Sequence, residues 1–314
     1  MVVLEAFEAQ PCVVTGAARG IGRAVALALA GRGHPVCVDD TGVDLDGRGP
    51  SRGPAEQVAA EIVARGGAAM ALSVDARSPD AARGLVAEVE AWAGRPPTVL
   101  VHAAGTLRDG MVHKASDDDW AEVLGAHLSV AVELTRAMAP AVRAGRQGRI
   151  VYVGGAAGLV GSVGQAAYDV AKAGLFGLTR AVALEMAGRD VCVNYVAPFA
   201  FTRMTESIPP VNDRLRAYRE AAPLARPEDV APVVDWLCSA AASGISGQVF
   251  GARGAEVALW SQPRPVVRLC EQRGWDVGRL EESARPRFEP HLTPLESEFD
   301  LFGGPPVAVL REAP

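Results

Sequence analysis

The chain has 314 residues, and 49% of them are hydrophobic, so it is long enough to bury a full-sized core. Its formal net charge of −6 excludes the basic footprint of a nucleic-acid-binding or membrane-surface protein. The first residues lack a basic segment followed by a long apolar run, and no apolar stretch has the length of a membrane span. We therefore predict a cytoplasmic protein with no nucleic-acid or membrane partner.

Short β-branched runs alternate with segments of helical apolar spacing from residue 11 to residue 251. This alternation predicts a doubly wound parallel α/β sheet of about seven strands, covered by helices on both faces. The predicted strands are Cys12–Thr15, Pro35–Val38, Ala69–Val74, Val99–His102, Arg149–Val153, Val191–Val196 and Val249–Gly251. The predicted helices include Ile21–Gly31, Ala55–Arg65, Ala81–Trp92 and one that begins after the N-cap Ser116.

A glycine-rich turn, "TGAARGIG", joins the first predicted strand to the first helix. Gly16, Gly20 and Gly22 let the backbone turn tightly and approach a pyrophosphate, whose charge meets the positive end of the helix. The order of strand, glycine turn, helix, strand and acid is typical of the Rossmann dinucleotide site. We predict that this turn, with Arg19 and Ile21, binds a dinucleotide.

Asp40 ends the second predicted strand, where a carboxylate can accept hydrogen bonds from the adenosine ribose. A 2′-phosphate beside it would suffer like-charge repulsion, so we predict NAD as the cofactor. NADP remains the alternative if Arg23, Arg48 or Arg52 folds back toward this position. The neighbouring Asp39 is predicted to be a solvated strand end.

Two more strands end in residues suited to the cofactor. The first is followed by Asp75 and Ala76, the second by Ala103, Ala104 and Gly105. Since open α/β sheets bind ligands at the carboxyl ends of their strands, we predict adenine and ribose contacts there. The alternative is a simple turn and a tight connection.

The chain divides into a dinucleotide-binding and catalytic domain, residues 1–255, and a C-terminal extension, residues 256–314. From residue 261 on, the extension carries eight prolines, and we expect one helix around Val266–Arg273. It retains Trp275, Phe288, Phe299, Leu301 and Phe302, whereas disordered segments usually lack such residues. We predict that it packs at a subunit interface of a homodimer or homotetramer.

The five cysteines are widely spread and show no CxxC pair, so we expect buried free thiols and no metal site.

Four motifs occur in order along the chain: "TGAARGIG", "VHAAG", "YDVAK" and "NYVAP". Together they resemble the short-chain dehydrogenase/reductase family over about residues 10–255. The segments "GTLRDG", "GQAAY" and "TRMT" look like the hydroxyacyl-CoA dehydrogenase units of multifunctional β-oxidation enzymes. The resemblance adds Pro198 and Thr202 to the cofactor site, with Thr202 at the nicotinamide.

Tyr168 and Lys172 lie four residues apart and share one face of a helix. In the family that these motifs resemble, the tyrosine exchanges a proton with the substrate oxygen while a nicotinamide moves a hydride. The lysine bonds the ribose and favours the phenolate. The resemblance therefore implies that both residues are catalytic and touch the cofactor.

The sequence departs from this family at Gly155, where a serine normally bonds the substrate oxygen. Three explanations are open. Ser162 could fold over the site, His102 or the substrate could replace the lost donor, or the protein no longer performs ordinary carbonyl reduction.

His127 stands where most of the family has asparagine, and we predict either a catalytic proton relay or a satisfied core histidine. Asp169 is either a solvated helix carboxylate or a general base. Phe199 and Phe201 suggest an apolar lip for a bulky substrate.

These observations favour an NAD(P)-dependent oxidoreductase that acts on a hydroxyl/ketone pair of an acyl thioester, steroid or polyketide-like substrate. A non-redox cyclase, dehydratase or isomerase is the second hypothesis. An inactive cofactor-binding partner subunit is the third.

Overall fold

The computed structural model describes residues 9–44, 49–145, 147–206, 213–301 and 305–309. Its centre is an eight-stranded sheet with the order β3-β2-β1-β4-β5-β6-β7-β8. The first seven strands run parallel, and the last pairs antiparallel with its neighbour. The predicted doubly wound α/β fold is thus confirmed. The sheet has eight strands rather than about seven because residues at the start of the extension add an edge strand.

The strands follow the predicted runs closely. Seven of them are largely buried, as expected of parallel strands that are covered on both faces. The eighth is an edge strand, and its Val257 and Leu259 are exposed. The bounds are β1 (Cys12–Thr15), β2 (Val36–Asp39), β3 (Ala69–Leu72), β4 (Val99–His102), β5 (Arg149–Val153), β6 (Cys192–Phe199), β7 (Val249–Arg253) and β8 (Glu256–Leu259).

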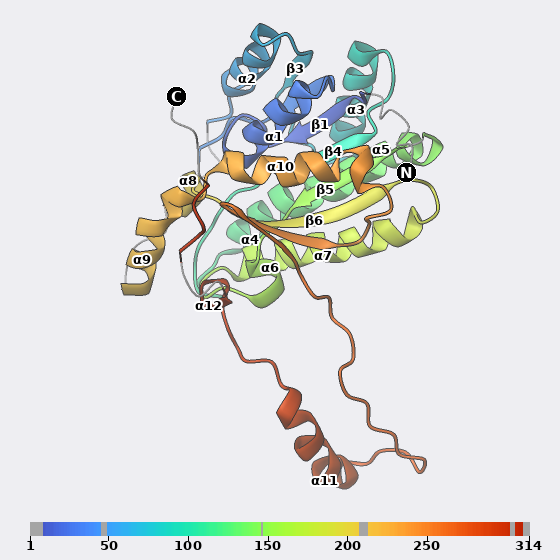
Figure 1. Cartoon of the computed structure of the whole chain (residues 1–314), viewed down its shortest axis with the longest axis vertical. Coiled ribbons are helices and arrows are strands. Elements are labelled where there is room, and N and C mark those ends of the chain that lie inside the picture. The colour runs from blue at the N-terminus through green and yellow to red at the C-terminus, as the bar shows by residue number, and fades with distance from the viewer. Residues whose placement is uncertain (1–8, 45–48, 146, 207–212, 302–304, 310–314) are drawn as a thin grey trace.

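Helices cover both faces of the sheet (Figure 1). One apolar cluster packs α1 (Gly20–Gly31), α2 (Gly53–Ala64) and α10 (Pro227–Leu237) against one face. A second cluster packs α3 (Pro79–Ala93), α5 (Val130–Ala144) and α7 (Ala166–Glu185) against the other face. The predicted helices are confirmed, with ends shifted by one or two residues.

Short helical segments connect these layers. As predicted, Ser116 caps the first of them, since its hydroxyl accepts a hydrogen bond from Asp119 N–H at 3.2 Å. The segments are α4 (Asp117–Leu124), the π-helical turn η1 (Gly125–Ser129), α6 (Ala157–Val160), α8 (Arg203–Glu206), α9 (Asp213–Ala221), η2 (Ala222–Leu224), η3 (Ala240–Ala242), α11 (Val277–Phe288), η4 (Glu289–His291) and α12 (Glu298–Leu301).

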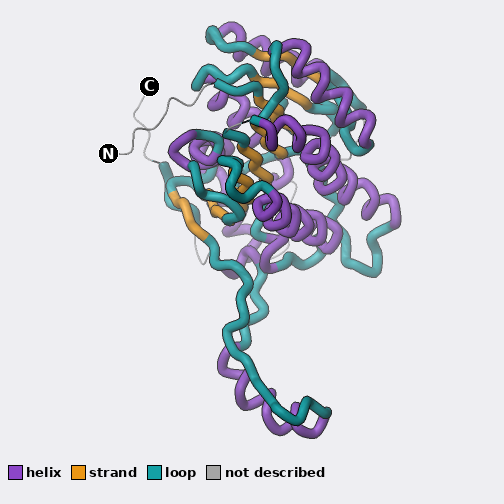
Figure 2. Tube along the Cα trace, turned by 90° about the vertical axis from the view of Figure 1, so that its right-hand side faces the viewer, coloured by secondary structure: helices purple, strands orange, loops and turns teal. Residues whose placement is uncertain are grey.

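The C-terminal extension leaves the body after β8 as an arm that carries α11 at its far end (Figure 2). Trp260 N–H anchors the departing end through Val249 O at 3.0 Å. The chain then returns to the body at α12. None of the described residues of α11 is buried, so this helix has no partner surface within its own chain.

The helix expected around Val266–Arg273 is wrong, because the extension is helical further along, in α11. Asp276 caps that helix by accepting a hydrogen bond from Arg279 N–H at 2.9 Å. Val266 is 78% exposed, so the apolar residues of the earlier segment find no surface on which a helix could pack.

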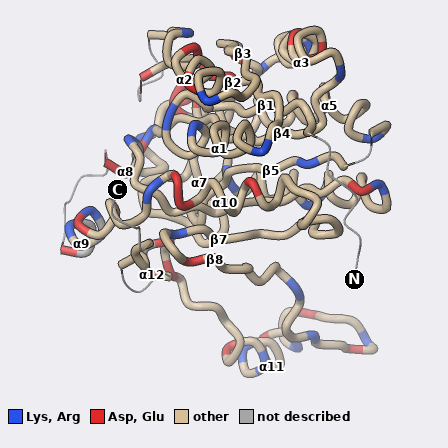
Figure 3. The backbone as a smooth tube through the Cα atoms, turned by 45° about the horizontal axis from the view of Figure 1, so that its top comes forward, with Lys and Arg blue, Asp and Glu red and all other residues tan. Residues whose placement is uncertain are grey.

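Four of the five free cysteines are buried, as expected, but Cys270 lies exposed on the arm. Lys and Arg residues alternate with Asp and Glu over the described part of the chain (Figure 3). Among the described helices, none combines the length and apolarity needed to cross a bilayer.

Candidate active site

The glycine-rich turn lies at the carboxyl edge of the sheet, between β1 and α1. Gly16 has φ +65°, and a Cβ there would lie 2.7 Å from the backbone of Ala104. A Cβ on Gly22 would overlap Gly16 O, so this close turn requires glycine at both positions. The N-cap residue Arg19 offers no side-chain acceptor to the first N–H groups of α1. These N–H groups fit the pyrophosphate of a dinucleotide.

The structure separates the other residues predicted around this turn. Thr202 approaches it, since a Cβ on Gly20 would lie 3.5 Å from Thr202 Cγ2. Arg19 donates to Val43 O at 3.1 Å, in the loop after β2. Ile21 packs against the apolar core under α1. The site therefore offers Thr202 and the backbone of the turn for polar contacts, while the Ile21 side chain faces the core.

Two adjacent carboxylates at the end of β2 occupy different environments. Asp40 accepts hydrogen bonds from Ala18 N–H at 2.9 Å and Gly42 N–H at 2.7 Å. Asp39 is buried rather than solvated, which corrects the sequence expectation, and accepts from Val74 N–H at 3.0 Å. Burial raises the pKa of Asp39 to about 7. Asp40 alone is placed at the rim, beside the glycine turn.

The ends of β3 and β4 lie along the same edge. Asp75 is bound to Arg77, with its carboxylate 3.2 Å from Nε, and Ala76 is fully buried. Ala103 N–H donates to Thr15 O at 3.2 Å. The Asp75 side chain stays 55% exposed, so it remains accessible to a ligand despite its pairing with Arg77.

Ala104 and Gly105, the next two residues, lie between the end of β1 and the π-helical turn η1. Ala104 N–H donates to Thr15 Oγ1 at 3.3 Å. A Cβ on Gly105 would overlap the His127 ring. Pro198, at the end of β6, pairs with Ala252 of β7 at this same edge.

Tyr168 and Lys172 lie on the first two turns of α7, next to the end of β5. Lys172 is buried, and its Nζ donates to Val153 O at 2.8 Å. Nζ lies 5.3 Å from the centroid of the Tyr168 ring. Burial lowers the pKa of Lys172 to about 7, so the ammonium is poised to lose its proton near neutral pH.

The open space at Gly155 adjoins the phenol of Tyr168. A Cβ on Gly155 would lie 3.2 Å from Tyr168 Oη and 3.8 Å from Lys172 Cγ. On the other side of the strand, Tyr195 Oη both accepts from Gly155 N–H and donates to Gly155 O, each at 2.8 Å. A Cβ on Gly154 would overlap the Tyr195 ring. Gly154 therefore makes room for Tyr195, while Gly155 leaves room open beside Tyr168.

Two buried histidines, His102 and His127, lie on the core side of Tyr168. His127 lies in the π-helical turn η1, with its ring edge-on to Tyr168 at 5.2 Å between centroids. Its Nε2 lies 2.7 Å from Thr106 O, and its Nδ1 has no hydrogen-bond partner within the described residues. His102 is held between Thr15 Oγ1 at 2.9 Å and His127 O at 2.7 Å. The bonded Nε2 of His127 fits a structural role in the core. Nδ1 has no partner among the described residues, so it is the nitrogen that could take part in a proton relay.

Burial governs the charge of both rings. It lowers the pKa of His102 to about 3 and that of His127 well below its usual range. Both are therefore neutral at physiological pH. His102 is already bonded at both nitrogens, so it does not replace the serine hydroxyl.

Asp169 and Ser162 are bound to each other rather than placed in the roles predicted for them. The predictions were a solvated carboxylate or a general base for Asp169 and a hydroxyl folded over the site for Ser162. Asp169 is half-buried, and its Oδ2 accepts from Ser162 N–H at 2.7 Å. Burial raises the pKa of Asp169 to about 6. The heavy atoms nearest to a Cβ on Gly155 belong to Tyr168 and Lys172 rather than to Ser162, so Ser162 does not fold over that space. Asp169 is a loop-holding carboxylate rather than a solvated one.

The predicted apolar lip is only partly apolar. Phe199 is half-buried, and the guanidinium of Arg253 lies 5.2 Å from its ring centroid. Phe201 N–H donates to Ala225 O at 2.7 Å and fixes the segment after β6.

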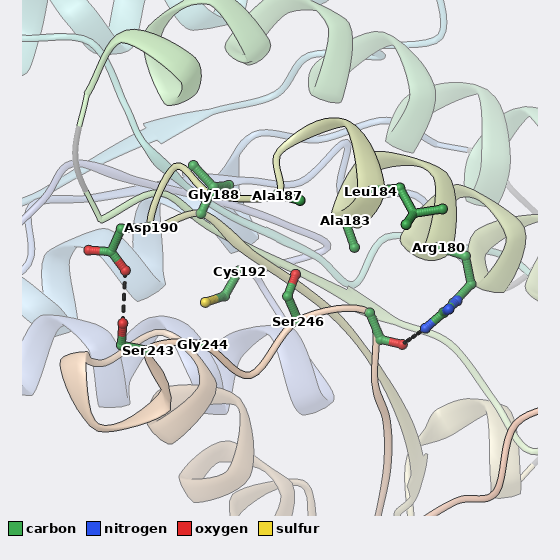
Figure 4. A pocket seen from close by; sticks show the side chains of 12 residues that line it. Arg180, Ala183, Leu184, Ala187, Gly188, Asp190, Cys192, Ser243, Gly244 and Ser246 are labelled. Carbon is green, nitrogen blue, oxygen red and sulfur yellow. Dashed lines mark hydrogen bonds between the residues drawn. The ribbon is translucent and has the colours of Figure 1, made fainter.

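A groove of about 520 Å³ lies at the opposite end of the sheet, between the end of α7 and the start of β6 (Figure 4). Its polar groups are already paired: Arg180 donates to Gly247 O at 2.8 Å, and Ser243 to Asp190 Oδ1 at 2.9 Å. None of the residues that line it belongs to the glycine turn or to the surroundings of Tyr168, so this groove is not part of the candidate active site. The described residues also contain no cluster of three His, Cys, Asp or Glu side chains placed to hold a metal.

Sequence reasoning missed two residues beside this site, Tyr195 and Glu298. The consecutive glycines 154 and 155 are the sequence signal for Tyr195, because a large side chain from another strand fills the space that a side chain at position 154 would occupy. Nothing local in the sequence points to Glu298, which approaches from the extension.

This chain is similar in sequence and in structure to several known proteins. A family model described as Enoyl-(Acyl carrier protein) reductase matches residues 16–254. The hydroxyacyl-CoA dehydrogenase ChsB1 of Mycobacterium tuberculosis is 35% identical over 285 residues, covering 88% of this chain and 87% of that protein. The peroxisomal multifunctional enzyme type 2 of Mus musculus is 39% identical over 232 residues, covering 74% of this chain but 30% of that enzyme. A short chain dehydrogenase from Mycobacterium avium has a crystal structure with a TM-score of 0.77 and 34% identity, covering 91% of this chain and 96% of that one.

Proposed function

The chain belongs to the short-chain dehydrogenase/reductase family of oxidoreductases, and from this premise we propose that it interconverts the hydroxyl and ketone of a bulky acyl thioester with NAD as cofactor. The single observation that carries this proposal is the position of Tyr168, with Lys172 Nζ 5.3 Å from its ring centroid and its Oη beside the open space at Gly155. Relatives named as hydroxyacyl-CoA dehydrogenase and 3-oxoacyl-[acyl-carrier-protein] reductase support the acyl thioester over a steroid or polyketide-like substrate.

The residues at the edge of the sheet divide the binding of the cofactor among them. The glycine turn and the first N–H groups of α1 would hold the pyrophosphate, Asp40 the adenosine ribose, and Thr202 the nicotinamide end. Bound NAD supplies the acceptor or donor of the hydride. Lys172 would leave Val153 O in part and donate to the second ribose.

Tyr168 would exchange the proton of the substrate oxygen, as an acid in reduction and a base in oxidation. The nearby ammonium of Lys172 favours the phenolate by charge proximity. With Gly155 in place of a serine, the developing oxyanion has one fewer hydrogen-bond donor, which typically costs about 10² to 10³ in rate.

The ion pairs around Asp40 support NAD rather than NADP. Arg23 is paired with Glu61 at 2.6 Å, and Arg52 with Glu56 at 3.2 Å, so a 2′-phosphate would have to compete with a carboxylate for either guanidinium. Arg48 lies outside the described residues.

The arm supports a homo-oligomer, a dimer or a tetramer. Leu280 and Phe288 of α11 are exposed in the single chain, and an isolated helix of this length is marginal in water. A second copy of the chain would cover them. Sedimentation analysis of the whole chain, beside a variant with both residues changed to serine, tests this part of the proposal.

Absorbance at 340 nm with 3-oxoacyl-CoA and 3-hydroxyacyl-CoA substrates of increasing chain length tests the activity. We expect turnover with NADH or NAD and a loss of at least about a hundredfold in Tyr168→Phe. Absence of hydride transfer from either cofactor across this panel would refute the proposal.

The empty space at Gly155 favours one second candidate, a non-redox enzyme on the same scaffold. Asp169 does not support it as the base, because Ser162 N–H occupies its Oδ2. Product formation in the absence of nicotinamide would favour this candidate.

A further inference from the structure

The segment that follows β5 is held by residues of the neighbouring strand β6. Gly154 N–H donates to Val196 O at 2.7 Å and continues the pairing of the two strands. The next residue is held by a side chain instead, because Tyr195 Oη accepts from Gly155 N–H and donates to Gly155 O, each at 2.8 Å. Gly158 N–H adds a longer bond to Gly155 O, at 3.3 Å. One hydroxyl therefore bonds both main-chain polar groups of Gly155.

Glycine at positions 154 and 155 leaves this segment without side chains of its own. Neither residue has a positive φ, so the backbone conformation does not require glycine there. A Cβ on Gly154 would overlap Cζ and Oη of Tyr195, so glycine at 154 makes room for the phenol to reach Gly155. A glycine backbone is also the least restricted, because it has no Cβ. The hydrogen bonds from Tyr195 therefore restrain a segment that has no side chain to anchor it.

Tyr195 is itself held in place by the core. It is fully buried on β6, which lies next to β5 in the sheet (Figure 1). Its N–H donates to Gln248 O at 2.9 Å, and its ring packs edge-on to Phe176 of α7 at 6.3 Å between centroids. Burial raises the pKa of its hydroxyl above the ordinary value, so the group keeps the proton that it donates to Gly155 O.

We propose that Tyr195 is a positioning residue, whose hydroxyl fixes the main chain of Gly155 and so sets the width of the open space beside Tyr168. A Cβ on Gly155 would lie 3.2 Å from Tyr168 Oη, so the two residues border the same space. Misplacement of reacting groups by about 1 Å can cost about a hundredfold in rate. The kinetic part of this inference rests on the proposed function, whereas the two hydrogen bonds do not.

The same segment also holds the lysine of the proposed reaction. Val153 is the last residue of β5, and its carbonyl accepts a hydrogen bond from Lys172 Nζ at 2.8 Å. Residues 153–155 thus border both Tyr168 and Lys172. The proposed pyrophosphate and adenosine contacts lie elsewhere, at the glycine turn and Asp40. Loosening the main chain at Gly155 should therefore lower kcat rather than weaken the binding of the cofactor.

Hydrogen exchange resolved to single amides tests the two hydrogen bonds of Tyr195 without any substrate. Tyr195→Phe removes the hydroxyl and keeps the ring that fills the space beside Gly154. We expect the Gly155 amide to lose about tenfold in protection relative to the amides of β5, because its acceptor is gone. The Gly154 amide, whose acceptor is Val196 O, should stay within about twofold of the wild type.

Tyr152→Phe is the matched control. Tyr152 is fully buried on β5 and pairs in register with Tyr195, but its hydroxyl lies 2.6 Å from Thr135 Oγ1. This variant also loses one buried tyrosine hydroxyl, so it matches the general loss of stability. We expect both kcat and the protection of the Gly155 amide to stay within about twofold of the wild type.

The kinetic readout separates positioning from general stability. We expect Tyr195→Phe to lower kcat about tenfold or more, with the KM for NAD within about twofold of the wild type. An unchanged Gly155 amide in Tyr195→Phe would overturn the inference. Equal losses of kcat in Tyr195→Phe and Tyr152→Phe would overturn it as well, and so would reduced protection of the Gly155 amide with unchanged kcat.

Two further outcomes keep this inference apart from the proposed function. Reduced protection of the Gly155 amide in a protein without dehydrogenase activity supports the restraint by Tyr195 and refutes only the proposed function. If Tyr195→Phe does not fold, the wild-type chain decides the question. A wild-type Gly155 amide that exchanges as fast as in an unfolded chain would show that Tyr195 does not hold it, and slow exchange would support the restraint.

Discussion

Restoring a hydroxyl at residue 155 is the sharpest perturbation of the proposed reaction. A Cβ added to Gly155 would meet Tyr168 Oη at 3.2 Å, Tyr168 Cε1 at 3.6 Å and Lys172 Cγ at 3.8 Å. All three atoms belong to side chains, so a shift of a few tenths of an ångström accommodates the new atom. Gly155 is also absent from the residues with positive φ, and its backbone suits any L-residue.

The hydroxyl of Gly155→Ser would therefore lie beside Tyr168 Oη, where the proposed reaction places the substrate oxygen. One donor to a developing oxyanion is typically worth about 2.7–4 kcal/mol, or about 10² to 10³ in kcat. We expect ketone reduction to rise by up to that factor. Gly155→Ala is the matched control, because it adds the same Cβ without a donor.

Stopped-flow absorbance at 340 nm on both variants measures this effect. A rise in Gly155→Ser that is missing from Gly155→Ala supports a weakened dehydrogenase. If neither variant gains activity, or if both change equally, a hydroxyl at position 155 does not aid the reaction and the reasoning is refuted.

Three further outcomes are expected. Gly154→Ala should lower the free energy of unfolding by about 1–3 kcal/mol, because its Cβ overlaps the Tyr195 ring; urea denaturation measures this, and an unchanged midpoint would contradict the overlap. Burial lowers the folded pKa of Lys172 to about 7, below its unfolded value, so this amine makes the free energy of unfolding rise with pH above about 7. Lys172→Met should remove about 2 kcal/mol of that rise between pH 7 and 9. An identical dependence of the free energy of unfolding on pH in both proteins would be evidence against the shift. Asp40→Ser should move the ratio of kcat/KM for NADH over NADPH at least about tenfold toward NADPH, and an unmoved ratio would show that Asp40 does not select the cofactor.

The sheet and its order of elements could be predicted because local signals suffice for them. Apolar runs such as Val99–His102 are long enough to identify strands buried on both faces. The glycine turn is equally local, since Gly16 and Gly22 reflect contacts within the same turn or with the adjacent strand. Ser116 was identifiable as an N-cap because its partner Asp119 is three residues away.

The features that could not be predicted depend on contacts distant in sequence. Asp39 and Asp40 are identical in type and adjacent, yet only the sheet geometry buries one and leaves the other at the rim. The raised pKa of Asp169 depends on its burial and on the Asp109 carboxylate, 60 positions away in the sequence. In the extension, the apolar spacing predicted a helix around Val266–Arg273, but the helix is Val277–Phe288. The arm provides no surface against which the apolar residues of the earlier segment could pack.

The interlock of Gly154 with Tyr195 imposes an order on mutational change. A larger residue at 154 is accessible only after the ring at 195 has been reduced, so these two positions are epistatic. Position 155 carries no such restriction, because its free side is bounded only by the movable phenol of Tyr168 and the stem of Lys172. A hydroxyl at position 155 can therefore be introduced by one substitution, without a prior change at a neighbouring position.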